Sequence, residues 1–503
     1  MAKASGIAAG SLLGLFGLAA GYLSQYAFNV SAARVISSPN LAGKLFQTIA
    51  FAQFLAIVGR AGLDRVSLRT FGAAHGKHNG EDLVGIWRRI TLWVVGLSTL
   101  VALLAFWQRH WLLGILKLPV ANPYLPLLFF ATPFLAMSFT SSQALRGVGW
   151  IGKATLAQLT LVFAPPAIVI AILKLAYGSI ELSTLIGIWL FSTIIAAVAG
   201  YFWTQNGLRR AVPKADVEIQ LSPLQGSRRI PSGAFNFFLL GLLGYTHSGL
   251  EIILLGAWSN TVEVTRYIAS ARTAMFVGLG LVAIASVLGR LYAAAHARQD
   301  HEEMKTVLGK AGRWALSFAV VSGGCLLLGH QLIIDLFGIN FPNALPCFGA
   351  ILVGHTVNAG AGGLFLLLQM TGNERASTVC LVVATAIGLV AYWFLIPLFG
   401  SVGAAAGLSV LIITWNVLMA LVSKRALNLQ PFSPKLWPSL LVLMAAYFVA
   451  EWTNPVGFGA ILAVAIYFVV AVALVWKFYL IPAEREAIAN SIKRLRGRSS
   501  AQV

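Results

Sequence analysis

Charge is scarce in this sequence, and negative charge most of all. Only 10% of the 503 residues are charged, with 16 Asp and Glu against 36 Lys and Arg, while 58% are hydrophobic and the mean hydropathy is +0.81. A soluble chain of this length could not stay in solution with so little polar surface. The scarcity therefore excludes a soluble globular protein and indicates a polytopic membrane protein.

Groups that usually carry chemistry are also few. The three cysteines, Cys325, Cys347 and Cys380, stand apart within apolar stretches and lack the paired spacing of a metal or redox site. The sequence has no Walker A lysine loop, and its short predicted outer loops carry almost no acids. We therefore predict no catalytic residue, no metal site and no cofactor, and we do not expect an enzyme.

Long hydrophobic runs are what the sequence has in abundance. A helix needs roughly 20 apolar residues to cross about 30 Å of hydrocarbon, and the chain contains about fourteen such segments, separated by Gly, Pro and charged clusters. We predict an all-α fold with spans near residues 8–30, 43–62, 88–108, 123–146, 153–175, 182–204, 233–257, 264–291, 312–336, 345–370, 376–398, 402–423, 436–451 and 456–480.

The Lys and Arg residues fall mainly on one side of these spans. With an even number of spans and the N-terminus inside, 29 of the 36 lie on the inner side. The seven left for the outer side or the membrane interior are Arg34, Lys44, Arg109, Lys117, Lys174, Arg266 and Arg272. The positive-inside rule then predicts that both termini are cytoplasmic. Its +20 net charge is explained by contact with the anionic inner leaflet, without a nucleic-acid partner.

A short segment occurs twice at a constant offset. Arg69–Lys77, followed by Glu81, matches Arg290–Arg298, followed by Glu302, and 290 less 69 and 302 less 81 both give 221. Each copy follows a long apolar segment, which indicates that about half of the chain is duplicated. Because six spans return the chain to its starting side, the two lobes would be parallel repeats, an arrangement typical of transporters.

This duplication predicts the division of the chain. The first lobe comprises residues 1–204 and the second residues 233–425, joined by a polar cytoplasmic linker at 205–232 with three prolines and five basic residues. Residues 426–480 add two spans without a counterpart. Residues 481–503 form a basic cytoplasmic tail, in which hydrophobic residues at helical spacing indicate an amphipathic interfacial helix.

Polar residues within the spans are costly in lipid and usually face a cavity or a partner. They recur at helical spacing along the first span and near the outer end of the second. We therefore consider a wet, cationic cavity, with helix-to-helix contacts as the alternative explanation. The candidate cavity residues are Tyr22, Gln25, Tyr26, Asn29, Arg34, Lys44, Gln47, Arg272 and Asn358.

Glu251 is an acid within the seventh predicted span. It lies about 9–12 Å inside the outer boundary, with His247 one helical turn before it and Arg272 at a similar depth in the next span. A carboxyl that alternates between protonated and paired states would couple transport to protons or cations. Glu251 and His247 are therefore candidate ion-coupling residues, and a permanent buried pair with Arg272 is the alternative.

Five segments carry a family resemblance. They are Gly62–Arg69, Leu145–Gly149, Ile334–Gly338, Gln369–Gly372 and Ile396–Ala406. Together they resemble the polysaccharide (O-antigen, Wzx-type) flippases, which share a superfamily with MATE multidrug transporters and lipid II flippases. The resemblance covers about residues 8–425 and implies a MATE-like transporter with two lobes and a central cationic cavity.

The resemblance also implies a cargo. Such a flippase moves an undecaprenyl-diphosphate-linked oligosaccharide from the cytoplasmic to the outer leaflet by alternating access, for cell-surface polysaccharide biosynthesis. Its implied partners are this lipid-linked oligosaccharide, the anionic inner-leaflet lipids and the polysaccharide polymerase machinery. The alternatives are a lipid II flippase or a multidrug/cation antiporter of the same fold, and a membrane enzyme of envelope polysaccharide assembly.

Overall fold

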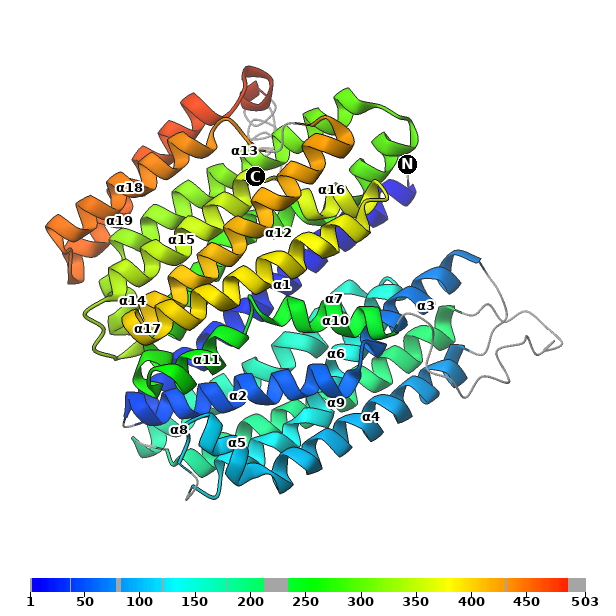
Figure 1. Ribbon diagram of the computed structural model, residues 1–503, viewed down its shortest axis with the longest axis vertical. Helices are drawn as coiled ribbons and strands as arrows, with labels where there is room; N and C mark the ends of the chain where they lie inside the picture. The colour runs from blue at the N-terminus through cyan, green and yellow to red at the C-terminus, as the bar shows by residue number, and fades with distance from the viewer. Residues whose placement is uncertain are drawn as a thin grey trace, which may run out of the picture. The chain divides into compact units, whose positions relative to one another are not determined.

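All the regular secondary structure of the described residues is helical. The computed structural model describes residues 2–36, 38–77, 83–119, 122–178, 180–211, 234–429 and 432–486, and none of these residues is in a strand (Figure 1). Among them, eleven helices are long and apolar enough to cross a membrane, or twelve if one bent pair counts as a span. The all-α polytopic fold is therefore confirmed, whereas the number of fourteen spans is not.

The chain divides into two compact units. Unit 1 comprises Met1–Ala269, Leu336–Phe341 and Leu389–Leu408, and unit 2 comprises Ser270–Asp335, Pro342–Gly388 and Ser409–Val503. The helices α10 (Ala234–Tyr245) and α11 (Leu250–Trp258), expected at the start of the second lobe, contact α2 and α3 and belong to unit 1. The division into lobes, linker and extra spans thus stays a prediction. Residues 212–232 of the linker and 487–503 of the tail lie outside the described residues.

Unit 1 is built around closely packed helices of the first half of the chain. These are α1 (Ala2–Val35), α2 (Pro39–Arg60), α3 (Leu63–Lys77), α4 (Leu83–Trp107), α5 (Arg109–Ile115), η1 (Leu125–Ala131), α6 (Thr132–Gly147), α7 (Ile151–Thr155), the π-helical turn η2 (Leu156–Thr160), α8 (Leu161–Tyr177) and α9 (Leu182–Ala211). Figure 1 shows α2, α4, α6 and α9 running side by side. Small residues allow this approach: a Cβ atom on Gly59 of α2 would lie 2.6 Å from the Cα atom of Ser98 in α4.

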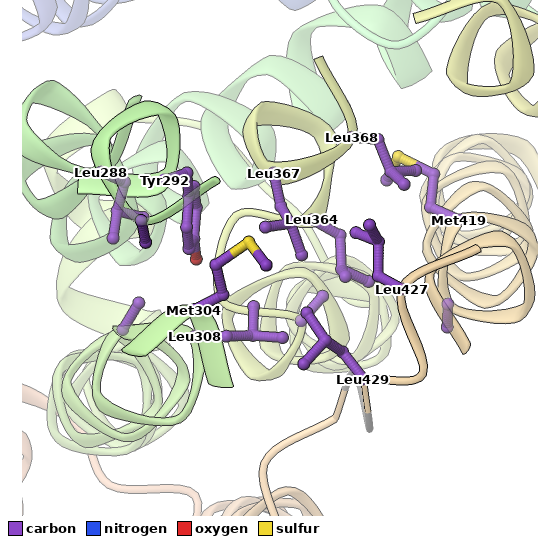
Figure 2. Close-up of a cluster of buried hydrophobic side chains, with 14 of the residues drawn as sticks. Leu288, Tyr292, Met304, Leu308, Leu364, Leu367, Leu368, Met419, Leu427 and Leu429 are labelled. Atoms are coloured by element: carbon purple, nitrogen blue, oxygen red, sulfur yellow. The ribbon is translucent and has the colours of Figure 1, made fainter. Parts of the chain in front are cut away.

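Unit 2 contains most of the remaining helices. They are α12 (Thr261–Ala297), α13 (His301–Leu328), α14 (His330–Phe337), α15 (Ala344–Gly360), α16 (Leu364–Met370), α17 (Glu374–Leu427), α18 (Leu436–Thr453), α19 (Gly457–Leu474) and η4 (Val475–Tyr479). Three of them also have residues in unit 1, namely the start of α12, the last two residues of α14 and the middle of α17, Leu389–Leu408. One end of this unit holds a buried apolar cluster. Figure 2 shows its side chains converging from α12, α13, α16 and the end of α17, with Tyr292, Met304 and Leu367 at the centre.

The tenth predicted span is broken between α15 and α16. Gly362 and Gly363 have φ angles of +61° and +85°, a left-handed region that favours glycine. The carbonyl groups released by the break find new donors: Tyr292 donates its hydroxyl to the Gly362 oxygen at 3.0 Å, and the Ser433 amide donates to the Gly360 oxygen at 3.1 Å. The break is therefore a stable feature of unit 2.

The helix α17 joins two of the predicted spans through a second glycine. Gly400 adopts φ +55° and ψ −124°, so the helix turns between the segments expected at 376–398 and 402–423. Glu263 of α12 accepts a hydrogen bond from the Ser401 amide at 2.9 Å and pairs with Arg266 at 2.6 Å. One carboxylate thus caps the second half of α17 and is itself neutralised.

The C-terminal segment is attached to unit 2 through one acid. Glu484 accepts hydrogen bonds from Arg313 at 3.2 Å and from the Trp314 indole at 3.3 Å, both on α13. Its other oxygen accepts from the Ile481 amide at 3.1 Å. Because the Arg313 and Glu484 side chains are only 21% and 12% exposed, this contact is shielded from water more than an ordinary surface ion pair.

Candidate functional site

The polar stripe on α1 lies within unit 1. Gln25 and Asn29 are 8% and 5% exposed, and the Asn29 side chain donates to the Gln25 carbonyl at 2.8 Å. Tyr22 and Tyr26 are half-buried, and the Tyr26 ring packs edge-on against Phe337 with centroids 5.6 Å apart. Two members of the stripe are thus buried among protein atoms, and whether the stripe lines a wet cavity stays a prediction.

Arg146, one of the 29 Lys and Arg residues predicted on the inner side, is a cation near this stripe. It lies at the end of α6, and Tyr22 and Arg65 are the ionisable side chains that act on it electrostatically. Its guanidinium donates at 3.0 Å to the amide oxygen of Gln158, which also accepts from Ser142 at 2.9 Å. Among the described residues Arg146 has no carboxylate partner, and its buried Nε has no acceptor.

Gln158 owes its position to local helix geometry. It lies in the π-helical turn Leu156–Thr160, which carries the chain from α7 into α8. The turn packs against α1 so closely that a Cβ atom on Gly21 would lie 2.9 Å from the Leu159 side chain. Because π-helical turns are often found at functional sites, the pairing of Gln158 with Arg146 marks this part of unit 1 as a candidate anion site.

The N-terminal end of α2 is in contact with α11 and the start of α12. A Cβ atom on Gly43 would lie 1.6 Å from the Thr261 carbonyl oxygen. Asn40 accepts a hydrogen bond from Thr261, and Thr265 donates to the Pro39 carbonyl at 2.7 Å. Backbone therefore meets backbone here, as glycine permits.

Gln47 is fully buried in the same contact. Its side-chain amide donates to the carbonyls of Leu116 at 3.0 Å and Ile253 at 3.3 Å, and the residue is 0% exposed. Lys44, one turn earlier, is half-buried. Arg34 at the end of α1 is exposed, and its carbonyl accepts a hydrogen bond from Lys174 at 3.1 Å. Gln47 thus connects three segments of unit 1, and a cavity role for Lys44 and Arg34 stays a prediction.

The seventh predicted span is broken beside the proposed ion-coupling residues. The helices α10 and α11 meet at a 54° bend, His247 lies in the break, and Glu251 is the second residue of α11 and 4% exposed. Tyr392 donates its hydroxyl to the Thr246 carbonyl at 3.3 Å and lies close enough to interact electrostatically with Glu251. A carboxylate in the first turn of a helix is favoured by the helix dipole.

The remaining candidates, Arg272 and Asn358, belong to unit 2. Arg272 lies in α12 and directs one guanidinium nitrogen to the Met275 sulfur at 3.4 Å, while its buried Nε has no acceptor among the described residues. Asn358 in α15 accepts a hydrogen bond from Asn416 at 3.2 Å. The proposed pairing of Arg272 with Glu251 of unit 1 stays a prediction. Within the described residues, no group of three or more His, Cys, Asp or Glu side chains could hold a metal ion.

The sequence and the structure were compared with known proteins. The MatE family model matches residues 15–173, and the sequence has no significant match among curated proteins. The structure is similar to the lipid II flippase MurJ in an inward closed conformation, with a TM-score of 0.66, 12% identity, and coverage of 93% of this chain and 98% of the other.

Two multidrug transporter structures and a related protein are also similar. An inward-facing multidrug resistance MATE family transporter of the MOP superfamily aligns with a TM-score of 0.59, 15% identity, and coverage of 80% and 94%. An outward-facing multidrug resistance MATE family transporter aligns with a TM-score of 0.52. A MOP superfamily transporter from Pyrococcus furiosus, described as having a binding pocket of reversed polarity, aligns with a TM-score of 0.54. Each of the two has 15% identity and coverage of 84% of this chain and 95% of the other. The chain therefore has the fold of MOP superfamily transporters and flippases, and it carries a region that matches the MatE family.

Proposed function

We propose that the protein is a flippase that moves an undecaprenyl-diphosphate-linked oligosaccharide from the cytoplasmic to the outer leaflet of the bacterial plasma membrane. The observation that carries this proposal is Arg146, a half-buried cation with a buried Nε and no carboxylate partner among the described residues, beside the polar stripe of α1. A buried charge is expensive unless it is paired. Arginine also binds phosphate through two parallel hydrogen bonds, so a diphosphate would supply the missing anion.

The rest of the cavity would serve the sugars. Tyr22, Gln25, Tyr26 and Asn29 provide hydroxyl and amide groups for hydrogen bonds with a glycan, and Lys44, Arg34 and Arg272 would add positive charge along its route. The fold is compatible with this role, because alternating access requires helical bundles that move against each other around a fixed site. We place both termini in the cytoplasm from the distribution of Lys and Arg, and the polymerase machinery would receive the product.

A reconstituted flipping assay tests this proposal. Proteoliposomes would contain the purified protein and a fluorescent lipid-linked oligosaccharide, and a membrane-impermeant reagent would report the fraction that reaches the opposite leaflet. We expect Arg146→Gln to slow flipping by about tenfold or more, since a factor of ten corresponds to ~1.4 kcal/mol of lost interaction. Lys424→Gln, at an exposed cation in the last turn of α17, is the matched control and should flip at the wild-type rate.

Two outcomes would contradict the proposal. Equal flipping rates for wild type and Arg146→Gln would show that Arg146 does not bind the cargo. If no diphosphate-linked glycan were flipped at all, the proposed class of cargo would be wrong. Lipid II would be tested in the same vesicles. Faster flipping of lipid II than of the lipid-linked oligosaccharide would favour the alternative, a lipid II flippase.

A cation antiporter is the second candidate function, and the position of Glu251 favours it. A buried carboxylate at a break between two helices is a suitable group for exchanging a proton with a cationic substrate. Efflux of cationic dyes from cells that express the protein, abolished by Glu251→Gln, would support the antiporter. Dye efflux at the background level would exclude it.

A further inference from the structure

Two cations and two tryptophans form a cluster on unit 1, at the predicted inner ends of the fifth and sixth spans. The Trp150 cluster, as we name it, consists of Trp150, Lys153, Trp203 and Arg210. The Lys153 ammonium lies 4.2 Å from the centre of the Trp150 ring and 5.9 Å from that of Trp203, and the Arg210 guanidinium lies 5.8 Å from the Trp150 ring. One indole therefore contacts two positive charges.

The local sequence holds the central ring in place. Gly149, with φ +86°, reverses the chain after α6, and the Trp150 amide then donates to the Leu145 carbonyl at 2.8 Å. Both indoles pack on a small buried cluster that includes Leu145. Gly207 of α9 lies against the Trp150 ring, since a Cβ atom added there would lie 3.5 Å from it. The rings are thus fixed by packing, whereas Lys153 and Arg210 are exposed.

The charges of the cluster are not balanced by the described residues. Neither Lys153 nor Arg210 forms an ion pair with a carboxylate in the described ranges, and the exposed Arg209 adds a third positive charge nearby. An indole face attracts a cation but does not neutralise it, so two cations on one ring repel each other. An anion between them would remove this repulsion.

The surroundings indicate which anion is available. Tryptophan is enriched at the level of lipid headgroups. Trp150 directly precedes α7, and Trp203 lies in the last third of α9. Ile151 and Phe202, the neighbours of the two tryptophans in sequence, are 38% and 53% exposed, as side chains that face acyl chains would be. Ammonium and guanidinium groups bind phosphate oxygens through charge-assisted hydrogen bonds.

We propose that the Trp150 cluster is a binding site for the phosphate headgroup of an anionic phospholipid of the inner leaflet. Lys153 and Arg210 hold the phosphate from two helices, and the indoles keep the two cations in position. A lipid bound in this way joins the start of α7 to the end of α9. The site does not involve Arg146 or the stripe on α1, so it stands independently of the cargo proposed above.

Lipid binding to the purified protein tests this site directly. Native mass spectrometry would measure the affinity for phosphatidylglycerol and for phosphatidylcholine in wild type and in Lys153→Gln/Arg210→Gln. We expect the double variant to bind phosphatidylglycerol about tenfold more weakly, because each cation near an anionic headgroup contributes a several-fold increase in affinity. Lys153→Arg, which keeps a cation on the indole, should bind as wild type does.

The matched control is Lys424→Gln/Arg425→Gln, which removes the same charge from exposed positions of unit 2. It should keep the wild-type affinity, and an equal loss there would overturn the proposal by showing a general charge effect. Binding of phosphatidylcholine as tight as that of phosphatidylglycerol would also overturn it.

The chain itself offers another source of negative charge. Asp216 and Glu218 follow Arg210 in the sequence and lie outside the described residues. We expect Asp216→Asn/Glu218→Gln to bind phosphatidylglycerol as wild type does. A marked gain of lipid binding in this variant would assign the counter-charge to the linker and would overturn the lipid site.

Discussion

Gln47 illustrates at the residue scale how a polar side chain is accommodated inside this membrane protein. Both hydrogens of its amide are donated to backbone carbonyls from two other segments, which offsets the burial cost of the donors, while its buried oxygen has no donor among the described residues. The space for the amide comes from Gly256 on α11, where a Cβ atom would lie 2.2 Å from the Gln47 Cδ. The pair therefore works as one packing unit.

This pairing predicts a coupled effect on stability. Gly256→Ala should destabilise the protein by ~1–3 kcal/mol, the usual cost of overpacking, because the new methyl group displaces the Gln47 amide. In the Gln47→Ala background the same substitution should cost much less. Thermal unfolding in detergent measures the cycle, with Gly96→Ala on the open face of α4 as a control that leaves the melting temperature unchanged or raises it. Additive effects in the double variant would contradict the coupling.

Glu251 carries the second prediction at this scale. We expect Glu251→Gln to abolish ion-coupled transport and to leave the melting temperature near the wild-type value, because the amide keeps the shape but can no longer exchange a proton. Flipping with and without an imposed proton or sodium gradient is the measurement. Glu374→Gln, in the exposed first turn of α17, is the control. If Glu251→Gln kept its gradient-driven transport, Glu251 would have a structural role only and no role in ion coupling.

The sequence could identify polar residues within the spans but not their partners. Gln47 and Asn29 are candidates because each shares one face of its own helix with other polar residues, and helical spacing cannot distinguish a cavity from a buried hydrogen bond. Arg146 falls on the inner side because it ends a predicted span. Its hydrogen bond with Gln158 is what indicates a candidate anion site. The position of Gln158 depends on a π-helical turn, which hydrophobic periodicity does not reveal.

At the scale of the element, glycine determines where helices stop. Gly400 has a positive φ angle, and a Cβ atom there would lie 2.8 Å from the Glu263 carboxylate. Gly400→Ala should therefore destabilise the protein by ~1–2 kcal/mol from backbone strain, with a further loss from contact with Glu263. Gly187→Ala, on an open face of α9, should be neutral or stabilising in the same thermal assay. Equal melting temperatures for the two variants would show that this turn tolerates a side chain.

The helix breaks were only partly predictable. Glycine and proline both weaken helical hydrogen bonding, and the tenth predicted span does break at its glycine-rich segment, residues 360–363. At Pro165–Pro166 in the fifth predicted span α8 instead continues through both prolines, and the irregular turn lies before them at Leu156–Thr160. The break at Thr246–Gly249 was missed because its stabilising contact, the Tyr392 hydroxyl, comes from a distant part of the sequence.

At the scale of the whole molecule, composition determined the class. Hydropathy alone predicted an all-α membrane protein, because a helix that crosses lipid needs a long apolar run whatever its neighbours are. The number of spans was harder to predict, since α17 continues across two of the expected segments and the seventh span is divided. Packing between distant segments could not be predicted at all, as the placement of α10 and α11 in unit 1 shows.

The contact between α2 and α12 gives a prediction for the transport cycle. If lobes formed by the two halves of the chain separate during alternating access, Asn40 and Thr261 must part. In a background that lacks the three native cysteines, Asn40→Cys/Thr261→Cys should form a disulfide under oxidation and stop flipping, and a reductant should restore the rate. Each single cysteine variant is the control. A cross-linked protein that still flips its cargo would show that this contact is permanent.

The Glu484 contact has a practical consequence for anyone who shortens this chain. A stop codon placed directly after Tyr479, at the visible end of the last apolar helix, would delete the acid and leave Arg313 without its acceptor in a poorly hydrated place. Expression should then fall, although no transmembrane residue has been lost. Truncation after Glu486 retains the acid, and affinity tags or fluorescent reporters are best fused beyond that point.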